Sequence, residues 1–85
     1  MTGSATEQDI QEHFAHCVQI LGGTTASARR LGIDERAIRR FINGEKPISG
    51  GLLDDMAKAL RLLSSDAAAA EHHIAAVLRS APKDV

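Results

Sequence analysis

The sequence predicts an all-α fold of five helices, and three observations carry that prediction. Apolar residues recur at steps of three and four along most of the chain, whereas the two-residue alternation typical of strands is absent. Glycine-containing breaks divide this pattern into short segments. The chain has 85 residues, of which 44% are hydrophobic and 25% charged, which suits one globular domain and leaves little room for a large catalytic cleft.

The first helix is expected from Glu7 to Leu21, after a flexible polar leader at residues 1–6. Its apolar positions fall on one side, as an amphipathic helix requires: Ile10, Phe14, Cys17, Val18 and Leu21. Gly22 and Gly23 end it, because glycine adopts the left-handed conformation of a helix C-cap without steric cost.

Two short helices follow. The second is expected from Thr24 to Leu31 and is closed by Gly32. Asp34 is a good N-cap, so the third helix is expected over residues 34–43. On this helix Ala37, Ile38, Phe41 and Ile42 share one side, and Arg36, Arg39, Arg40 and Asn43 share the other.

The fourth helix is expected over residues 50–63, after a break at Asn43-Gly44 and Pro47 and a cap at Ser49. Its apolar side contains Leu53, Met56, Leu60 and Leu63. These four helices give a domain over residues 7–63.

A turn is predicted at Ser64-Ser65-Asp66, and alanine-rich residues 67–79 then predict a fifth helix that ends before Pro82. The segment 64–81 has two open interpretations. Ile74, Val77 and Leu78 can pack on the domain core or form a dimer contact, and the two are not exclusive. Residues 82–85 are expected to form a frayed tail.

Positive charge is concentrated in the middle of the chain. The net charge is only −1, but residues 24–50 carry +3, while residues 1–23 carry −3 and residues 51–85 carry −1. Such a local cluster is typical of a nucleic-acid-binding surface. Phe14 and Phe41 are the only aromatic residues, so a stacking platform for single-stranded nucleic acid is not expected.

The spacing of residues between Thr24 and Phe41 predicts two helices that cross steeply through a tight turn. Ala28 supplies a small residue at the crossing, and Gly32 supplies the turn residue that tolerates positive φ. The apolar residues expected to lock the crossing are Leu31, Ile33, Ile38 and Phe41.

At these residues the chain resembles the lambda-repressor-like, or phage Cro and repressor type, helix-turn-helix family. The resemblance covers roughly Ile10 to Leu63, is closest to short prophage-borne Cro-like regulators, and includes the Asn-Gly-x-x-Pro exit at residues 43–47. It implies a homodimeric, sequence-specific regulator that binds duplex DNA, usually as a repressor, in a bacterial or phage cytoplasm.

The resemblance and the helix geometry together imply which side chains contact DNA. The helix over residues 34–43 would enter the major groove, with Glu35, Arg36, Arg39 and Arg40 reading bases and Asp34 beside them. Phosphate contacts would come from Thr24, Thr25, Arg29, Asn43 and Lys46. Thr24 stands where many members have a glutamine that contacts the DNA backbone, and Ser27 stands where they bury a leucine or valine.

Other functions are less well supported by the residues. The alternative is a helix-turn-helix protein-interaction module, an antitoxin or phage adaptor whose basic face binds a toxin, another regulator or another acidic protein. His13, His16 and Cys17 lie close on one helix, but the cysteine belongs to the apolar stripe, and His72-His73 are adjacent residues that cannot face one ion together. No metal, cofactor, catalytic site or membrane contact is expected, and the single cysteine and absence of a leader peptide favour the cytoplasm.

Overall fold

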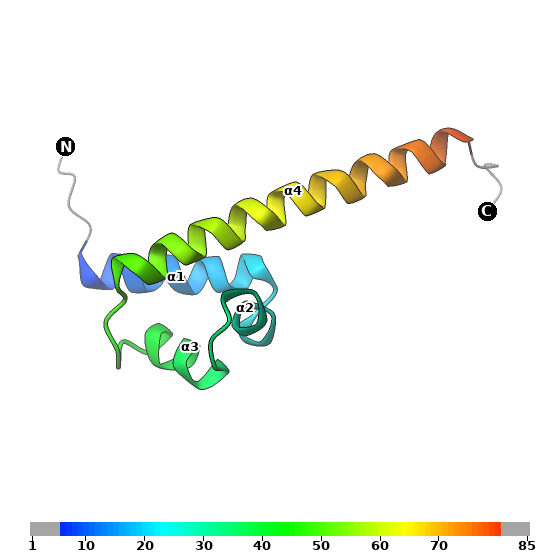
Figure 1. The fold of residues 1–85 in the computed structure, drawn as a ribbon. Helices are drawn as coiled ribbons and strands as arrows, with labels where there is room; N and C mark the ends of the chain where they lie inside the picture. Colours follow the sequence, from blue (N-terminus) through cyan, green and yellow to red (C-terminus); the bar gives the residue numbers. More distant parts are fainter. Residues whose placement is uncertain (1–5, 81–85) are drawn as a thin grey trace, which may run out of the picture.

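The computed structural model describes residues 6–80, which form four helices joined by short connections (Figure 1). They are α1 (Glu7–Leu21), α2 (Thr24–Leu31), α3 (Glu35–Ile42) and α4 (Gly50–Ser80). No strand occurs in this range, so the all-α prediction is confirmed. Most of the predicted leader, and the predicted tail at residues 82–85 with Ala81 before it, lie outside the described residues.

The helices α1, α2 and α3 pack with the first half of α4 into a small head, and the second half of α4 projects from it as an arm (Figure 1). Phe14 and Val18 of α1 and Ile38 of α3 are fully buried at the centre of the head. Phe14 meets Phe41 edge-on, with their ring centroids 5.8 Å apart. The remaining buried apolar residues are Cys17, Leu21, Ala28, Met56 and Ala59. With so few aromatic rings, aliphatic side chains fill most of the core.

The prediction of five helices is wrong, because the turn expected at Ser64-Ser65-Asp66 does not exist and α4 runs through it without interruption. Serine and aspartate favour caps and turns when the chain leaves the helix, but neither removes a backbone donor as proline does. Ala67 and the three alanines after it are the strongest helix formers and extend the helix already begun at Gly50.

The arm does not pack on the core. Every side chain from Ser64 to Ser80 is exposed except the half-buried Ala75. Ile74, Val77 and Leu78 are 57%, 48% and 68% exposed, so the core-packing interpretation of this segment is wrong for the single chain. Between residues 6 and 80, neither this long helix nor any other is apolar enough over its length to cross a bilayer.

Side-chain caps set where three of the helices begin. Thr6 and Asp9 form a capping box, in which the Asp9 N–H donates to Thr6 Oγ1 at 3.0 Å and the Thr6 N–H donates to Asp9 Oδ2 at 3.3 Å. Thr6 is therefore an ordered helix cap and not part of a flexible leader. Asp34 caps α3 through the Arg36 N–H, and Ser49 Oγ accepts from the Leu52 N–H at 3.0 Å, as the sequence predicts.

Glycine ends α2 in a backbone conformation that other residues adopt only with strain. Gly32 has φ +71°, and its N–H donates to the Ala28 carbonyl oxygen at 2.9 Å. A Cβ at Gly32 would meet nothing within 4 Å, so the backbone conformation alone requires glycine there.

We expect Gly32→Ala to lower the free energy of unfolding by about 1–2 kcal/mol, the cost of a left-handed alanine. The measurement is urea denaturation followed by circular dichroism. Gly51→Ala is the matched control, since Gly51 lies in the first turn of α4 without positive φ. That change should raise stability by up to about 1 kcal/mol. Equal effects of both variants would contradict the backbone explanation.

Candidate nucleic-acid interface

The turn between α2 and α3 places these helices at a fixed crossing in the head. The Gly32 and Ile33 N–H groups both donate to the Ala28 carbonyl oxygen, at 2.9 and 3.1 Å, and reverse the chain within three residues. Ala28, Ile38 and Phe41 are buried where the sequence places them, while Leu31 and Ile33 are half-buried against the same cluster. One side of α3 is therefore fixed to the head and the opposite side faces solvent.

Ser27 occupies the position where an apolar side chain is expected, and it is fully buried. Its hydroxyl donates to the Val18 carbonyl oxygen at 3.2 Å, and the same oxygen accepts from the Gly23 N–H at 2.9 Å. A buried hydroxyl needs a partner, and the C-terminal end of α1 provides one. Ser27 thus joins α2 to α1 by a hydrogen bond in place of apolar volume.

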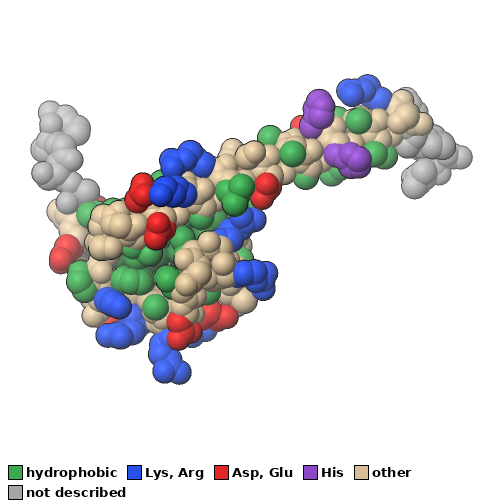
Figure 2. Space-filling model, viewed as in Figure 1, with side chains coloured by type: hydrophobic (Ala, Val, Ile, Leu, Met, Phe, Trp, Pro, Cys, Tyr) green, Lys and Arg blue, Asp and Glu red, His purple; other side chains and the backbone are tan. Residues whose placement is uncertain are grey.

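The outer side of α3 carries arginines beside acidic residues. Arg36, Arg39 and Arg40 are all exposed, as the sequence predicts. Arg39 forms an ion pair with Glu35 one turn earlier, at 3.2 Å, and Arg40 lies 3.8 Å from Glu45. Figure 2 shows this mixture of blue and red side chains on the part of the head that α3 forms. The face is basic on balance, but two of its arginines already have carboxylate partners.

The residues predicted to contact phosphate come from two segments, α2 and the chain that follows α3. Thr24 and Thr25 begin α2, whose N-cap is Gly23, so no side chain caps the first N–H groups of that helix. Such N–H groups and the helix dipole favour an anion. In the second segment, Asn43 is the C-cap of α3 and is exposed. Lys46 places its ammonium 5.5 Å from the centre of the Phe41 ring. Arg29 is exposed on α2.

A hydrogen bond that sequence reasoning missed fixes the C-terminal end of α3. Gln11 Nε2 on α1 donates to the Ile42 carbonyl oxygen at 2.7 Å. Gly44 lies so close that a Cβ there would come 2.9 Å from Gln11 Oε1. Gln11 and Ile42 are 31 positions apart, so no local pattern in the sequence could reveal their hydrogen bond.

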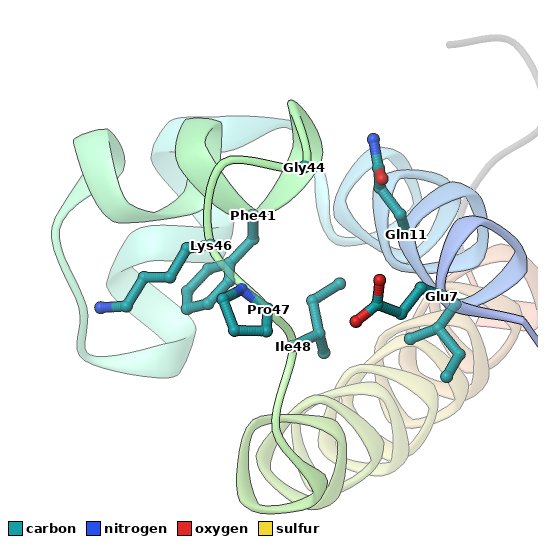
Figure 3. Close-up of a pocket in the computed structure, with 8 residues that line it drawn as sticks. Glu7, Gln11, Phe41, Gly44, Lys46, Pro47 and Ile48 are labelled. Carbon is teal, nitrogen blue, oxygen red and sulfur yellow. The ribbon is translucent and has the colours of Figure 1, made fainter.

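A hollow of about 290 Å³ opens beside this bond, between the start of α1 and the segment after α3 (Figure 3). Its lining mixes charged and apolar side chains: Glu7, Ile10, Gln11, Phe41, Gly44, Lys46, Pro47 and Ile48. The acid at one rim and the lysine at the other leave no concentration of charge of one sign. The hollow therefore has no feature that selects a ligand class.

Cys17 and the neighbouring histidines do not form a site in this structure. Cys17 is buried in the core, and burial raises the pKa of its thiol above the usual value, which disfavours the reactive thiolate. His13 and His16 are exposed, with ring centroids 6.2 Å apart. Over residues 6–80, no three histidine, cysteine or acidic side chains are grouped closely enough to hold a metal ion.

Comparison with known proteins gives no match among family models, curated proteins or solved structures. The function is therefore inferred from the residues and geometry described above.

Replacing Gln11 with alanine should loosen the end of α3, because the Ile42 carbonyl loses a donor from α1. We expect a loss of about 1 kcal/mol in the free energy of unfolding. Amide hydrogen exchange should also become faster at residues 43–45. Gln19→Ala is the matched control, since Gln19 is an exposed glutamine on the same helix. If the two variants exchange alike after residue 42, the bond does not position α3.

Proposed function

We propose that the chain is a sequence-specific duplex-DNA-binding regulator of transcription that acts as a homodimer and represses promoters by occupying them. In this proposal α2 and α3 form a helix-turn-helix, and α3 enters the major groove. The observation that carries the proposal is the two-sidedness of α3, with Ile38 and Phe41 anchored in the core and Arg36, Arg39 and Arg40 exposed. The major groove is wide enough to admit one α-helix.

Arg36 is the best candidate for reading a base directly. Within residues 6–80 no carboxylate lies within 4.0 Å of its guanidinium. Arginine can donate to O6 and N7 of guanine together, which accounts for most arginine specificity in the major groove. Arg39 and Arg40 must first exchange Glu35 and Glu45 for a DNA group, so their contribution to affinity is smaller. Glu35 contacts Arg39 through Oε1, so its second oxygen is available to accept from cytosine N4.

Contacts to phosphate would set the position of α3 in the groove. The candidates for these contacts are the uncapped start of α2 at Thr24 and Thr25 and the exposed cations of Arg29 and Lys46. Such contacts add affinity without sequence preference. Because the flanking parts of the chain are acidic, nonspecific attraction is limited, and discrimination between sequences depends on α3.

The ion pairs on α3 also favour a second candidate, a helix-turn-helix module that binds a protein. Glu35 and Glu45 give this face both signs of charge, and mixed charge suits a protein surface as well as DNA. The two functions differ in one property, since only the DNA-binding protein discriminates between duplex sequences.

The first test is selection of binding sites from a random duplex pool by the purified protein at moderate salt. We expect an enriched inverted repeat, because a two-fold dimer reads two equal half-sites. Its half-site spacing would then report the distance between the two α3 helices. Failure of a folded protein to enrich any sequence contradicts the DNA-binding proposal and favours the protein-binding one.

On the selected site, Arg36→Ala should weaken binding by about tenfold to a hundredfold and relax preference at one base pair. Lys46→Ala should weaken binding to all duplexes alike and lower the salt dependence by about one ion. Arg61→Ala, an exposed arginine on α4, is the control and should leave both properties unchanged. Fluorescence anisotropy over a salt series measures all three. Uniform weakening by Arg36→Ala would show that Arg36 reads no base.

A further inference from the structure

The apolar side of α4 that packs on the head continues along the arm. Its residues recur at alternating steps of four and three from one end to the other: Met56, Leu60, Leu63, Ala67, Ala70, Ile74 and Val77. On an α-helix this spacing keeps all of them on one side. Met56, Leu60 and Leu63 belong to the core or pack against it, whereas Ala67 and the residues after it face solvent.

Solvent exposure of this row is the unusual feature of the arm. Ile74 is 57% exposed, Val77 48%, and Leu78, which borders the row, 68%. Figure 2 shows green hydrophobic side chains along the arm as well as on the head. Grouped apolar side chains on a helix without a neighbour are typical of a surface that another chain covers.

We infer that residues 64–80 of α4 pair with the same residues of a second copy of this chain, in antiparallel orientation. The inference rests on the homodimer of the proposed function and names its interface, but it does not depend on whether α3 binds DNA. Three features of the arm select a second copy in this orientation.

The position of the head determines the direction of pairing. Because the apolar row is continuous, the head lies on the same side of α4 as the row, over its first half, where α1 and α2 contact α4 (Figure 1). In a parallel pair, both heads would lie at one end and between the two helices, in the same space. An antiparallel pair places the heads at opposite ends of the paired arms. There neither head blocks the arm of the other copy.

Pairing of the whole exposed segment sets the register between the two copies. Residues 64–80 form 17 positions centred on residue 72, so residue 64 of one copy lies opposite residue 80 of the other. The paired segment is about 25 Å long at 1.5 Å per residue. In this register, residue 80 of each copy lies next to the head of the other copy.

The exposed row has its two small residues, Ala67 and Ala70, in one half and its two branched residues, Ile74 and Val77, in the other, as this register needs. Ala67 lies opposite Val77 of the second copy, and Ala70 lies opposite Ile74 of the second copy. By the two-fold symmetry, each of these layers occurs twice. An alanine facing a branched side chain lets the helices approach closely with no void, whereas a parallel pair would set alanine against alanine and isoleucine against isoleucine. In antiparallel orientation, the apolar row of one copy is therefore complementary in side-chain size to the same row of the other copy.

Sedimentation equilibrium over a concentration series from low micromolar to several hundred micromolar tests the pairing. We expect the wild-type chain to form a dimer. Ile74→Asp with Val77→Asp should abolish it and leave the helical circular dichroism signal of the head, because neither side chain contacts the core. Ala68→Asp with Ala76→Asp puts the same charges on the opposite side of the arm and should leave the dimer intact.

Cysteine cross-linking tests the direction. In the antiparallel register, position 67 lies beside position 77 of the second copy, while two residues at position 67 are about 15 Å apart along the axis, beyond disulfide reach. Ala67→Cys and Val77→Cys proteins should therefore cross-link when mixed and oxidised, but not separately. Cys17 can remain, because it is buried.

Three outcomes would overturn the inference. A wild-type chain that stays monomeric over the whole concentration series, or a dimer that survives Ile74→Asp with Val77→Asp, excludes pairing through this row. Cross-linking of each cysteine variant with itself, without cross-linking in the mixture, would show a parallel pair. Since none of these measurements contains DNA, failure of this pairing is distinguishable from failure of DNA binding by α3.

Discussion

Ile38 and Phe41 bury one side of α3 against Phe14 and Val18 of α1, and the rest of the head depends on this contact. The edge-on pair of phenylalanines contains both aromatic rings of the chain, so the largest side chains available hold the two helices together. Because the buried side of α3 is fixed, its arginines are directed outward as a set. The orientation of the candidate interface therefore follows from core packing and not from interactions among the charges.

Acidic residues beside the α3 arginines reduce the positive charge of the candidate interface. Glu35 and Glu45 pair with Arg39 and Arg40 in exposed positions, where an ion pair contributes little to stability. Their greater effect is on binding, since a paired guanidinium must exchange one partner for another. A surface of this kind attracts polyanions only weakly in general. It binds best a ligand whose hydrogen-bond acceptors lie where the arginines can reach them.

One apolar row runs along both halves of α4, but its environment differs between the two halves. In the first half, the row closes the head over α1 and α2, and in the second half it is exposed. A head this small buries limited apolar surface, and association is a common way for short chains to bury more. If two arms pair, the chain gains a second head with a second basic face, which is what a symmetric duplex target requires.

Local patterns in the sequence predict much of this fold without any tertiary contact. Gly22 and Gly32 end their helices because of positive φ, Asp34 caps α3, and the three-four spacing assigns Ile38 and Phe41 to the buried side. Each of these depends on residues within one or two helical turns, which a sequence displays directly.

Tertiary structure decided the features whose causes are distant or collective. The Gln11 bond to Ile42 spans 31 residues, and the buried Ser27 hydroxyl depends on a carbonyl at the end of another helix. The predicted turn at residues 64–66 is absent because serine and aspartate side chains do not by themselves end a helix, and the alanines that follow continue it. Local geometry thus determined the helices and their faces, while packing between helices decided which faces were covered and which were left exposed.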